Sequence, residues 1–136
     1  MSKKSRRVPE RILDIREALA NAKSDIGTIS KDQFFRDGKT QRAVIESIIV
    51  IGESANSIMR LDPGIEQRNP EAWQHFRDVY DMRIVLTHEY FRVDASIVWD
   101  TVQSDFPKLE AILCSVDSGG NDTGNDSIGK DVEPLR

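Results

Sequence analysis

Cysteine is almost missing from this sequence of 136 residues, which contains only Cys114. A single cysteine cannot form a disulfide within the chain, and such scarcity is typical of proteins from a reducing compartment. We therefore exclude a small secreted fold held together by disulfides. Because a free cysteine usually behaves as a small apolar side chain, we expect Cys114 to lie in the core.

Long apolar runs are also missing. No stretch of about 18 consecutive apolar residues is present, which excludes a transmembrane helix of ordinary length. The basic start MSKKSRR leads directly into the charged segment VPERILDIRE, a pattern unlike that of a signal peptide. We expect a cytoplasmic protein that does not associate with a membrane.

A strong excess of positive charge, which is common in nucleic-acid binders, is absent because the formal net charge is −4. Five acidic and two basic residues in 117–136 account for −3 of this charge. Residues 1–116 are therefore nearly neutral overall. The composition does not predict a positive cleft, but it leaves room for a local one.

The length fits one compact domain. We predict a flexible basic N-terminus over 1–7, a helical domain over 8–116 and a disordered tail over 117–136. The tail is rich in Gly, Asp, Asn and Ser and contains little that a core could bury. The basic residues of 1–7 are expected to form a solvated terminus, with contact to RNA as the alternative.

Helical periodicity dominates the rest of the chain. The segment 8–26 places apolar residues on one face, has proline in its first turn and ends at Gly27. Ser30 and Gln33 have the spacing of a capping box, which predicts a helix start. A long helix is predicted over 40–60, where apolar residues cover more than one face.

The segment 70–90 is apolar around nearly its whole circumference. Such a helix requires neighbours on both sides, so it is either central in the bundle or packed against a second copy of the chain. Asp94 is expected to cap the final run, and Pro107 to kink it. Three aromatic residues are expected to lie in the core: Trp73, Phe76 and Trp99. Since strand signals are missing, we predict an all-α antiparallel bundle of four to five helices.

The stretch RIVLTHEY combines groups that could carry chemistry. Arg83, Thr87 and Tyr90 share one face of a continuing helix, whereas His88 points about 140° away from Arg83. The helix could end near His88, which would let the imidazole turn toward Arg83. Alternatively, a two-fold dimer could bring the groups of two copies together.

Arginine and histidine suit the cleavage of a phosphodiester. Arg83 offers a permanently charged fork for the phosphate, and His88 can accept a proton from a ribose 2′-hydroxyl. Tyr90 could donate to a phosphate oxygen or stack on a base. Glu53 is a candidate for orienting Arg83 through an ion pair, and Thr87 is a second candidate orienting residue.

Each of these residues also has a purely structural explanation. A histidine at a helix end favours the negative end of the helix dipole, and a tyrosine often closes the edge of a core. Arg83 could pair with Glu53 or Asp78 without any ligand. Gly52 is expected to mark close helix packing, because a lone glycine lacks the repeated pattern of a phosphate-binding loop.

No dedicated metal cluster is visible in the sequence. His75 is not at ligand spacing with His88, and there is no second cysteine. We therefore expect no metal site and no cofactor.

The motifs of this chain resemble those of a known family. Arg83, His88 and Tyr90 match the R-x4-H-x-Y motif of the HepT-like branch of the HEPN superfamily. TQRAVIESIIVIGESA is similar to the family's second-helix pattern, and HEYFRVDASIVWDTVQSDFPKLEAI is similar to the segment that follows the motif. The resemblance covers nearly all of 8–116. It departs from the common pattern at Ile84, where many relatives carry a polar residue, and at Ser54.

This resemblance implies a specific function. Members are small homodimeric helical toxins that act as metal-independent endoribonucleases, with two motifs at a shared cleft. Arg83 would stabilise the phosphate and His88 would act as acid and base. The paired antitoxin is a minimal nucleotidyltransferase, of the MNT type, which would transfer AMP to Tyr90 and so inactivate the toxin. The alternative is a non-catalytic helical module that binds RNA, a nucleotide or a protein partner.

Overall fold

The computed structural model describes residues 7–88 and 94–125, with side chains through residue 116. In chain order, its elements are α1 (Val8–Ile26), α2 (Lys31–Phe35), α3 (Gly38–Leu61), α4 (Ile65–Arg68), α5 (Pro70–His88), α6 (Ala95–Asp100), the π-helix η3 (Thr101–Asp105) and α7 (Phe106–Asn125). These ranges contain no strand. The predicted all-α fold is confirmed.

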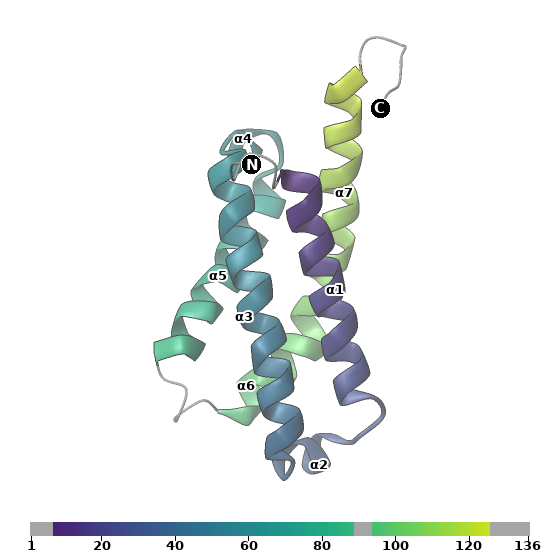
Figure 1. The fold of residues 1–136 in the computed structure, drawn as a ribbon, viewed down its shortest axis with the longest axis vertical. Coiled ribbons are helices and arrows are strands. Elements are labelled where there is room, and N and C mark those ends of the chain that lie inside the picture. The colour runs from purple at the N-terminus through teal and green to yellow at the C-terminus, as the bar shows by residue number, and fades with distance from the viewer. Residues whose placement is uncertain (1–6, 89–93, 126–136) are drawn as a thin grey trace.

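The long helices alternate in direction, as Figure 1 shows. Helix α3 is central, since it packs along both α1 and α5. Helix α7 packs against α1 and α5 and completes the bundle. The predicted antiparallel arrangement is therefore correct, and α5 is attached to the bundle mainly through α3.

The first helix begins and ends where the sequence predicts, and the second begins where its capping box predicts. The Glu10 carboxylate accepts a hydrogen bond from the Arg7 backbone N–H, and Gly27 ends α1 at φ +57°, a conformation that glycine adopts without strain. Ser30 and Gln33 cap α2 reciprocally, at 3.1 Å to the Ser30 hydroxyl and 2.8 Å to the Gln33 side chain. This capping box is confirmed.

Asp37 caps the N-terminus of α3. Its carboxylate accepts the backbone N–H of Thr40 at 3.1 Å and the Thr40 hydroxyl at 2.7 Å. These hydrogen bonds favour the charged carboxylate and hold the pKa of Asp37 below its ordinary value. Helix α3 starts at Gly38, directly after this cap.

Asp94 caps α6, as the sequence predicts. Its carboxylate accepts the backbone N–H of Ser96 at 2.8 Å, which lowers the pKa of Asp94. The helix then changes geometry, because Pro107 has no N–H and its ring would clash with the carbonyl four residues earlier. The chain widens into the π-helix η3 just before this proline, with the Phe106 N–H donating to the Thr101 carbonyl. The expected irregularity is present as a π-helix.

One apolar core joins all the long helices. Phe34 and Phe76 are completely buried, and the Phe34 ring lies 5.4 Å from the ring of Trp99. Trp73 and Trp99 are only partly buried and pack against the core from its edge. The core prediction is therefore confirmed for Phe76, and the two tryptophans form the rim. The largest fully buried aliphatic side chains are Ile15, Ile48, Ile51, Ile58, Leu86, Leu109 and Leu113.

Two expectations for the C-terminal region need correction. Cys114 is exposed rather than buried, because it points away from the face of α7 that carries Leu109 and Leu113. The segment 117–125 continues α7 as a helix, whereas the sequence predicted disorder from residue 117 onward. Extending an existing helix adds one hydrogen bond per residue without a new nucleation step.

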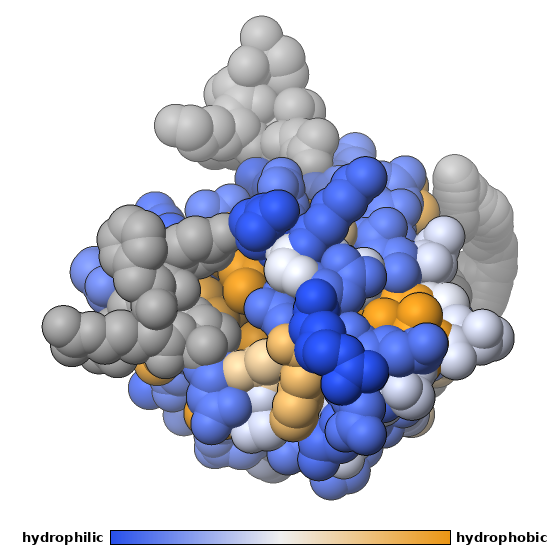
Figure 2. All heavy atoms as spheres, turned by 90° about the horizontal axis from the view of Figure 1, so that it is seen from below, coloured by the Kyte–Doolittle hydropathy of each residue, from blue (hydrophilic) through white to orange (hydrophobic). Residues whose placement is uncertain are grey.

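The end of the molecule seen in Figure 2 is mostly hydrophilic, with smaller apolar areas. No described helix is both long and apolar enough to cross a membrane. Several large apolar side chains are nevertheless exposed by more than a third: Leu13, Phe35, Val50, Leu61, Val85 and Ile97.

Candidate functional site

Arg83 of the R-x4-H-x-Y motif emerges where α5 and α3 are in closest contact. A Cβ atom added at Gly52 of α3 would lie 2.5 Å from the Cβ of Arg83 and 2.7 Å from the carbonyl oxygen of Val79. Only glycine allows this approach. The prediction that Gly52 marks close helix packing is confirmed, and the packing fixes the point from which the Arg83 side chain starts.

The guanidinium of Arg83 is partly covered and only weakly paired. Its Nη2 lies 3.4 Å from Oε2 of Glu53, and its Cζ lies 5.7 Å from the centre of the Tyr80 ring. Its Nε is buried and has no hydrogen-bond partner among the described residues. Of the two predicted carboxylate partners, the structure selects Glu53, since Asp78 accepts from Gln74 instead. Whether Glu53 orients Arg83 for catalysis stays a prediction.

A polar recess of about 290 Å³ surrounds this guanidinium. Helices α1, α3 and α5 each contribute to its wall. The lining residues are Arg11, Glu53, Asn56, Ser57, Tyr80 and Arg83. Two arginines and one glutamate give the lining a net positive formal charge, so an anion can be held here even though the whole chain is acidic.

His88 is exposed in the last turn of α5. Its Nδ1 lies 2.9 Å from the carbonyl oxygen of Ile84. Because a carbonyl oxygen can only accept a hydrogen bond, Nδ1 carries the proton in this contact. The other ring nitrogen, Nε2, then has a free lone pair when the imidazole is neutral. This is the form of histidine that can remove a proton from a substrate.

The structure does not bring His88 and Arg83 together within one chain. Helix α5 stays helical through His88, so the two side chains leave it about 140° apart. No hydrogen bond or ion pair joins them in the part of the chain that is described. Thr87 donates its hydroxyl to the carbonyls of Arg83 and Ile84, at 3.0 and 3.1 Å. Tyr90 lies outside the described residues.

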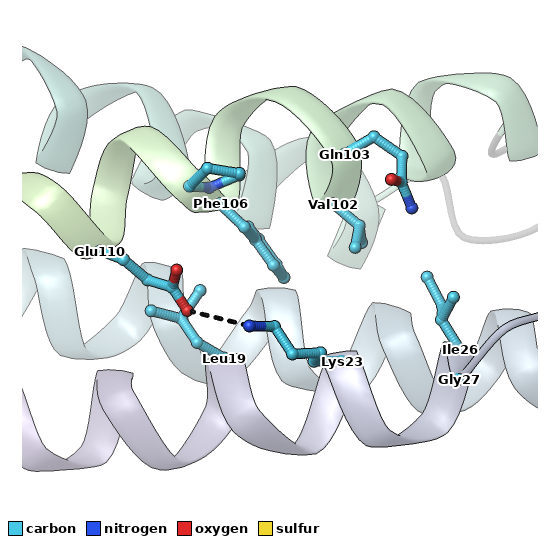
Figure 3. A pocket seen from close by; sticks show the side chains of 9 residues that line it. Leu19, Lys23, Ile26, Gly27, Val102, Gln103, Phe106 and Glu110 are labelled. Atoms are coloured by element: carbon cyan, nitrogen blue, oxygen red, sulfur yellow. Dashed lines mark ion pairs between the residues drawn. The ribbon is translucent and has the colours of Figure 1, made fainter.

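A second recess, of about 230 Å³, lies between α1 and the η3–α7 segment (Figure 3). Lys23 and Glu110 point toward each other across it, with 4.0 Å between Nζ and Oε2. The remaining lining is largely apolar, from Leu19, Ile26 and Phe106 among others. Among the residues that the structure describes, no histidine or arginine lines this recess, so the candidate site is the one at Arg83.

Four of the six residues that line the polar recess were not predicted from the sequence: Arg11, Asn56, Ser57 and Tyr80. Tyr80 precedes Arg83 by three residues, and Asn56 follows Glu53 by three, so helical spacing could have identified both as neighbours. For Arg11, helical spacing gave no such indication. It joins the site only because α1 packs along α3, a contact that local sequence patterns do not reveal.

The comparisons with known proteins agree with the resemblance to the HepT-like family. The family model described as ribonuclease HepT-like matches residues 15–116, a range that contains Gly52, Glu53, Arg83 and His88. This chain belongs to the ribonuclease HepT-like family. The matched range begins after Arg11, so the family match does not cover that residue.

Several relatives are similar to this chain over most of their lengths. The chain is 36% identical to "Probable ribonuclease HepT" of Thermococcus cleftensis over 71% of this chain and 84% of the relative. It is 32% identical to a "Putative RNase" of Caldanaerobacter subterraneus over 60% and 69% of the two chains. A "Putative RNase" of Methanocaldococcus jannaschii is 28% identical over 78% and 87%. No solved structure shows a significant match to the chain.

Proposed function

We propose that this HepT-like chain is a metal-independent endoribonuclease and the toxin of a bacterial toxin–antitoxin pair. Family membership and the names of its relatives support the ribonuclease activity. The observation that carries the mechanism is the contact between His88 Nδ1 and the Ile84 carbonyl. This contact leaves Nε2 of an exposed histidine free to act as a base.

In the proposed reaction the RNA supplies its own nucleophile. His88 Nε2 accepts the proton of a ribose 2′-hydroxyl, and the 2′-oxygen attacks the adjacent phosphorus. The bond from phosphorus to the 5′-oxygen breaks, and this oxygen takes up the proton that protonated His88 returns, directly or through water. The products are a 2′,3′-cyclic phosphate and a 5′-hydroxyl. Arg83 would counter the charge that develops on the phosphate oxygens.

The weak pairing of Arg83 suits this role. Glu53 is more than half exposed, and its contact with Arg83 is long at 3.4 Å. Exposed ion pairs contribute about 0–1 kcal/mol, so a phosphate can replace Glu53 at little cost. Glu53 contacts Nη2 of the Arg83 guanidinium, so most N–H groups of this guanidinium do not donate to Glu53.

The proposed active form is a homodimer. Since Arg83 and His88 leave α5 in different directions, a single chain does not present both to one phosphate. His88 and the exposed Val85 lie three residues apart and so share one face of α5. A two-fold partner on this face would bring the motif of a second copy, with its own Arg83, close to this one.

The proposed antitoxin is an MNT-type nucleotidyltransferase that transfers AMP to Tyr90. The added phosphate would compete with RNA for Arg83, which makes the modification a direct switch. We place the pair in the cytoplasm, where RNA is available and an exposed free thiol such as Cys114 remains reduced.

An RNA cleavage assay in EDTA tests the proposal. Purified wild-type protein should cleave RNA, and His88→Ala should lose at least about 100-fold in rate, because general base catalysis typically contributes that much. His75→Ala, in the same helix, is the matched control and should retain activity. Cleavage by folded His88→Ala, or complete loss of wild-type activity in EDTA, would refute the proposal. RNA binding without any cleavage would favour the non-catalytic binding module.

A further inference from the structure

Two arginines from different helices face the same polar recess. Arg11 lies in the first turn of α1 and Arg83 lies in α5. Both line the polar recess of about 290 Å³, to which α3 also contributes. Arginines on separate helices of a bundle can lie close together simply because the helices pack against each other. Like charges placed together nevertheless repel each other, so this pair requires a physical explanation.

The hydrogen bonds of these two arginines are incomplete in the same way. In the described part of the chain, two buried side-chain nitrogen or oxygen atoms lack a hydrogen-bond partner. They are Nε of Arg11 and Nε of Arg83. Leaving a buried N–H without an acceptor costs free energy. Both residues line the recess, so a ligand bound there lies next to the two side chains that carry these unpaired N–H groups.

The existing carboxylates satisfy these groups only in part. Arg11 Nη1 lies 3.5 Å from Asp14 of the same helix, and Arg83 Nη2 lies 3.4 Å from Glu53. Both distances are long for charge-assisted hydrogen bonds, which are usually about 2.7–2.9 Å. Asn56 and Ser57 add neutral polar groups to the same wall. A ligand with several acceptor oxygens and a negative charge would complete this set.

We infer that the recess binds a phosphate group of the RNA strand, with Arg11 as a second guanidinium beside Arg83. This inference rests on the proposed ribonuclease function and extends it to a residue outside the matched family range of 15–116. A planar guanidinium on each side can hold a tetrahedral phosphate in fixed orientation. Arg11 thus becomes a substrate-binding residue of the site.

The position of the recess on α5 favours a strand over a free nucleotide. Arg83 and His88 are five residues apart, which corresponds to about 7.5 Å along the helix axis. A phosphate in the recess therefore lies about a turn and a half before the histidine. A strand that continues from the recess along α5 passes the end of the helix where His88 is exposed.

Binding of a short 2′-O-methyl oligoribonucleotide tests the inference without cleavage, because the attacking hydroxyl is blocked. Binding is measured over a range of salt concentrations for the wild type, Arg11→Gln, Arg11→Lys and Arg83→Gln. Arg36→Gln is the matched control, since Arg36 is exposed at the end of α2, beyond the far end of α1. Thermal unfolding of each variant shows whether it is folded. AMP and inorganic phosphate serve as separate probes.

Arg11→Gln should weaken oligonucleotide binding about tenfold and reduce the slope of log K against log salt by about 0.7, the value for one lost contact to single-stranded nucleic acid. Arg83→Gln should have a similar effect, Arg11→Lys should keep the slope but bind more weakly, and Arg36→Gln should change neither. A wild-type slope for folded Arg11→Gln would overturn the inference. Arg11-dependent binding of AMP, without Arg11-dependent binding of the oligonucleotide, would overturn the assignment to RNA.

The test separates this inference from the proposed function. Arg11-dependent binding by a protein that never cleaves RNA would refute the ribonuclease proposal and retain the phosphate site. Normal RNA cleavage and binding by Arg11→Gln would refute the phosphate site and retain the ribonuclease.

Discussion

At the scale of single residues, Gly52 determines how the candidate site is built. Its missing side chain lets the Arg83 Cβ and the Val79 carbonyl approach α3 more closely than any other residue would allow. The same contact sets the direction in which the Arg83 guanidinium reaches the recess. Gly52 is therefore a positioning residue, whereas Arg83 is the residue proposed to contact substrate.

Replacing Gly52 with alanine should separate α3 from α5. We expect Gly52→Ala to lower the free energy of unfolding by about 1–3 kcal/mol, the usual cost of overpacking, and to reduce RNA cleavage. Gly38→Ala is the control in the same helix, because its added Cβ would meet only the flexible end of Arg42, at 3.2 Å. Urea unfolding measures both variants. Equal stability of Gly52→Ala and the wild type would show that α3 and α5 accommodate the added methyl group without cost.

Cys114 gives a second prediction at this scale. Because its side chain is exposed, the native protein should react with a thiol reagent such as DTNB without added denaturant. The sequence contains no other cysteine, so the signal is unambiguous. Reaction only after unfolding in urea would restore the original expectation of a buried thiol.

At the scale of helices, local sequence signals predicted most starts and stops. Ser30, Asp94 and Gly27 act at the positions where capping rules place them. These signals depend on residues three or four apart, which the sequence displays directly. The π-helix at 101–105 was not predicted in its actual form, because a kink, a bulge and a break all fit the same proline.

The cap at Asp37 predicts a specific dependence of stability on pH. Its folded pKa lies below the ordinary value of 3.8, so its contribution is fully present above about pH 3.8 and is lost as the pH falls through the folded value. Asparagine caps helices as well as aspartate but does not titrate. The stability of Asp37→Asn relative to the wild type should therefore rise between pH 5 and pH 2.

Urea midpoints at several pH values measure this effect. Asp25→Asn serves as the control, since Asp25 is exposed near the end of α1 and makes no cap. Parallel loss of stability in Asp37→Asn and the wild type across the acid range would mean that the Asp37 carboxylate contributes nothing to the cap.

At the scale of the whole molecule, packing between distant segments decides what the sequence could not show. The sequence offered Glu53 as one of two candidate partners of Arg83, beside Asp78, and the structure pairs Arg83 with Glu53. Arg11 was not predicted, since its place at the recess depends on how α1 lies along α3. Cys114 was misplaced for a related reason: helical periodicity shows which residues share a face, but the rotation of α7 against its neighbours decides which residues are exposed.

Self-association is the main prediction at this scale. Val85 is 52% exposed on the same face of α5 as His88, where a second copy would cover it. Val85→Lys should shift the protein from dimer to monomer and lower RNA cleavage with it. Leu13→Lys is the control, since Leu13 is 55% exposed on α1, and should stay dimeric. Light scattering after size-exclusion chromatography gives the mass. A monomeric wild type with full activity would contradict the dimer.

The most direct test of the account asks whether two copies share one active site. Arg83→Ala and His88→Ala should each be inactive, and the two proteins are then unfolded, mixed in equal amounts and refolded together. If Arg83 of one copy acts with His88 of the other, half of the dimers contain one intact site, and roughly a quarter of wild-type activity should return. No recovery in refolded mixed dimers would contradict a site built from two chains.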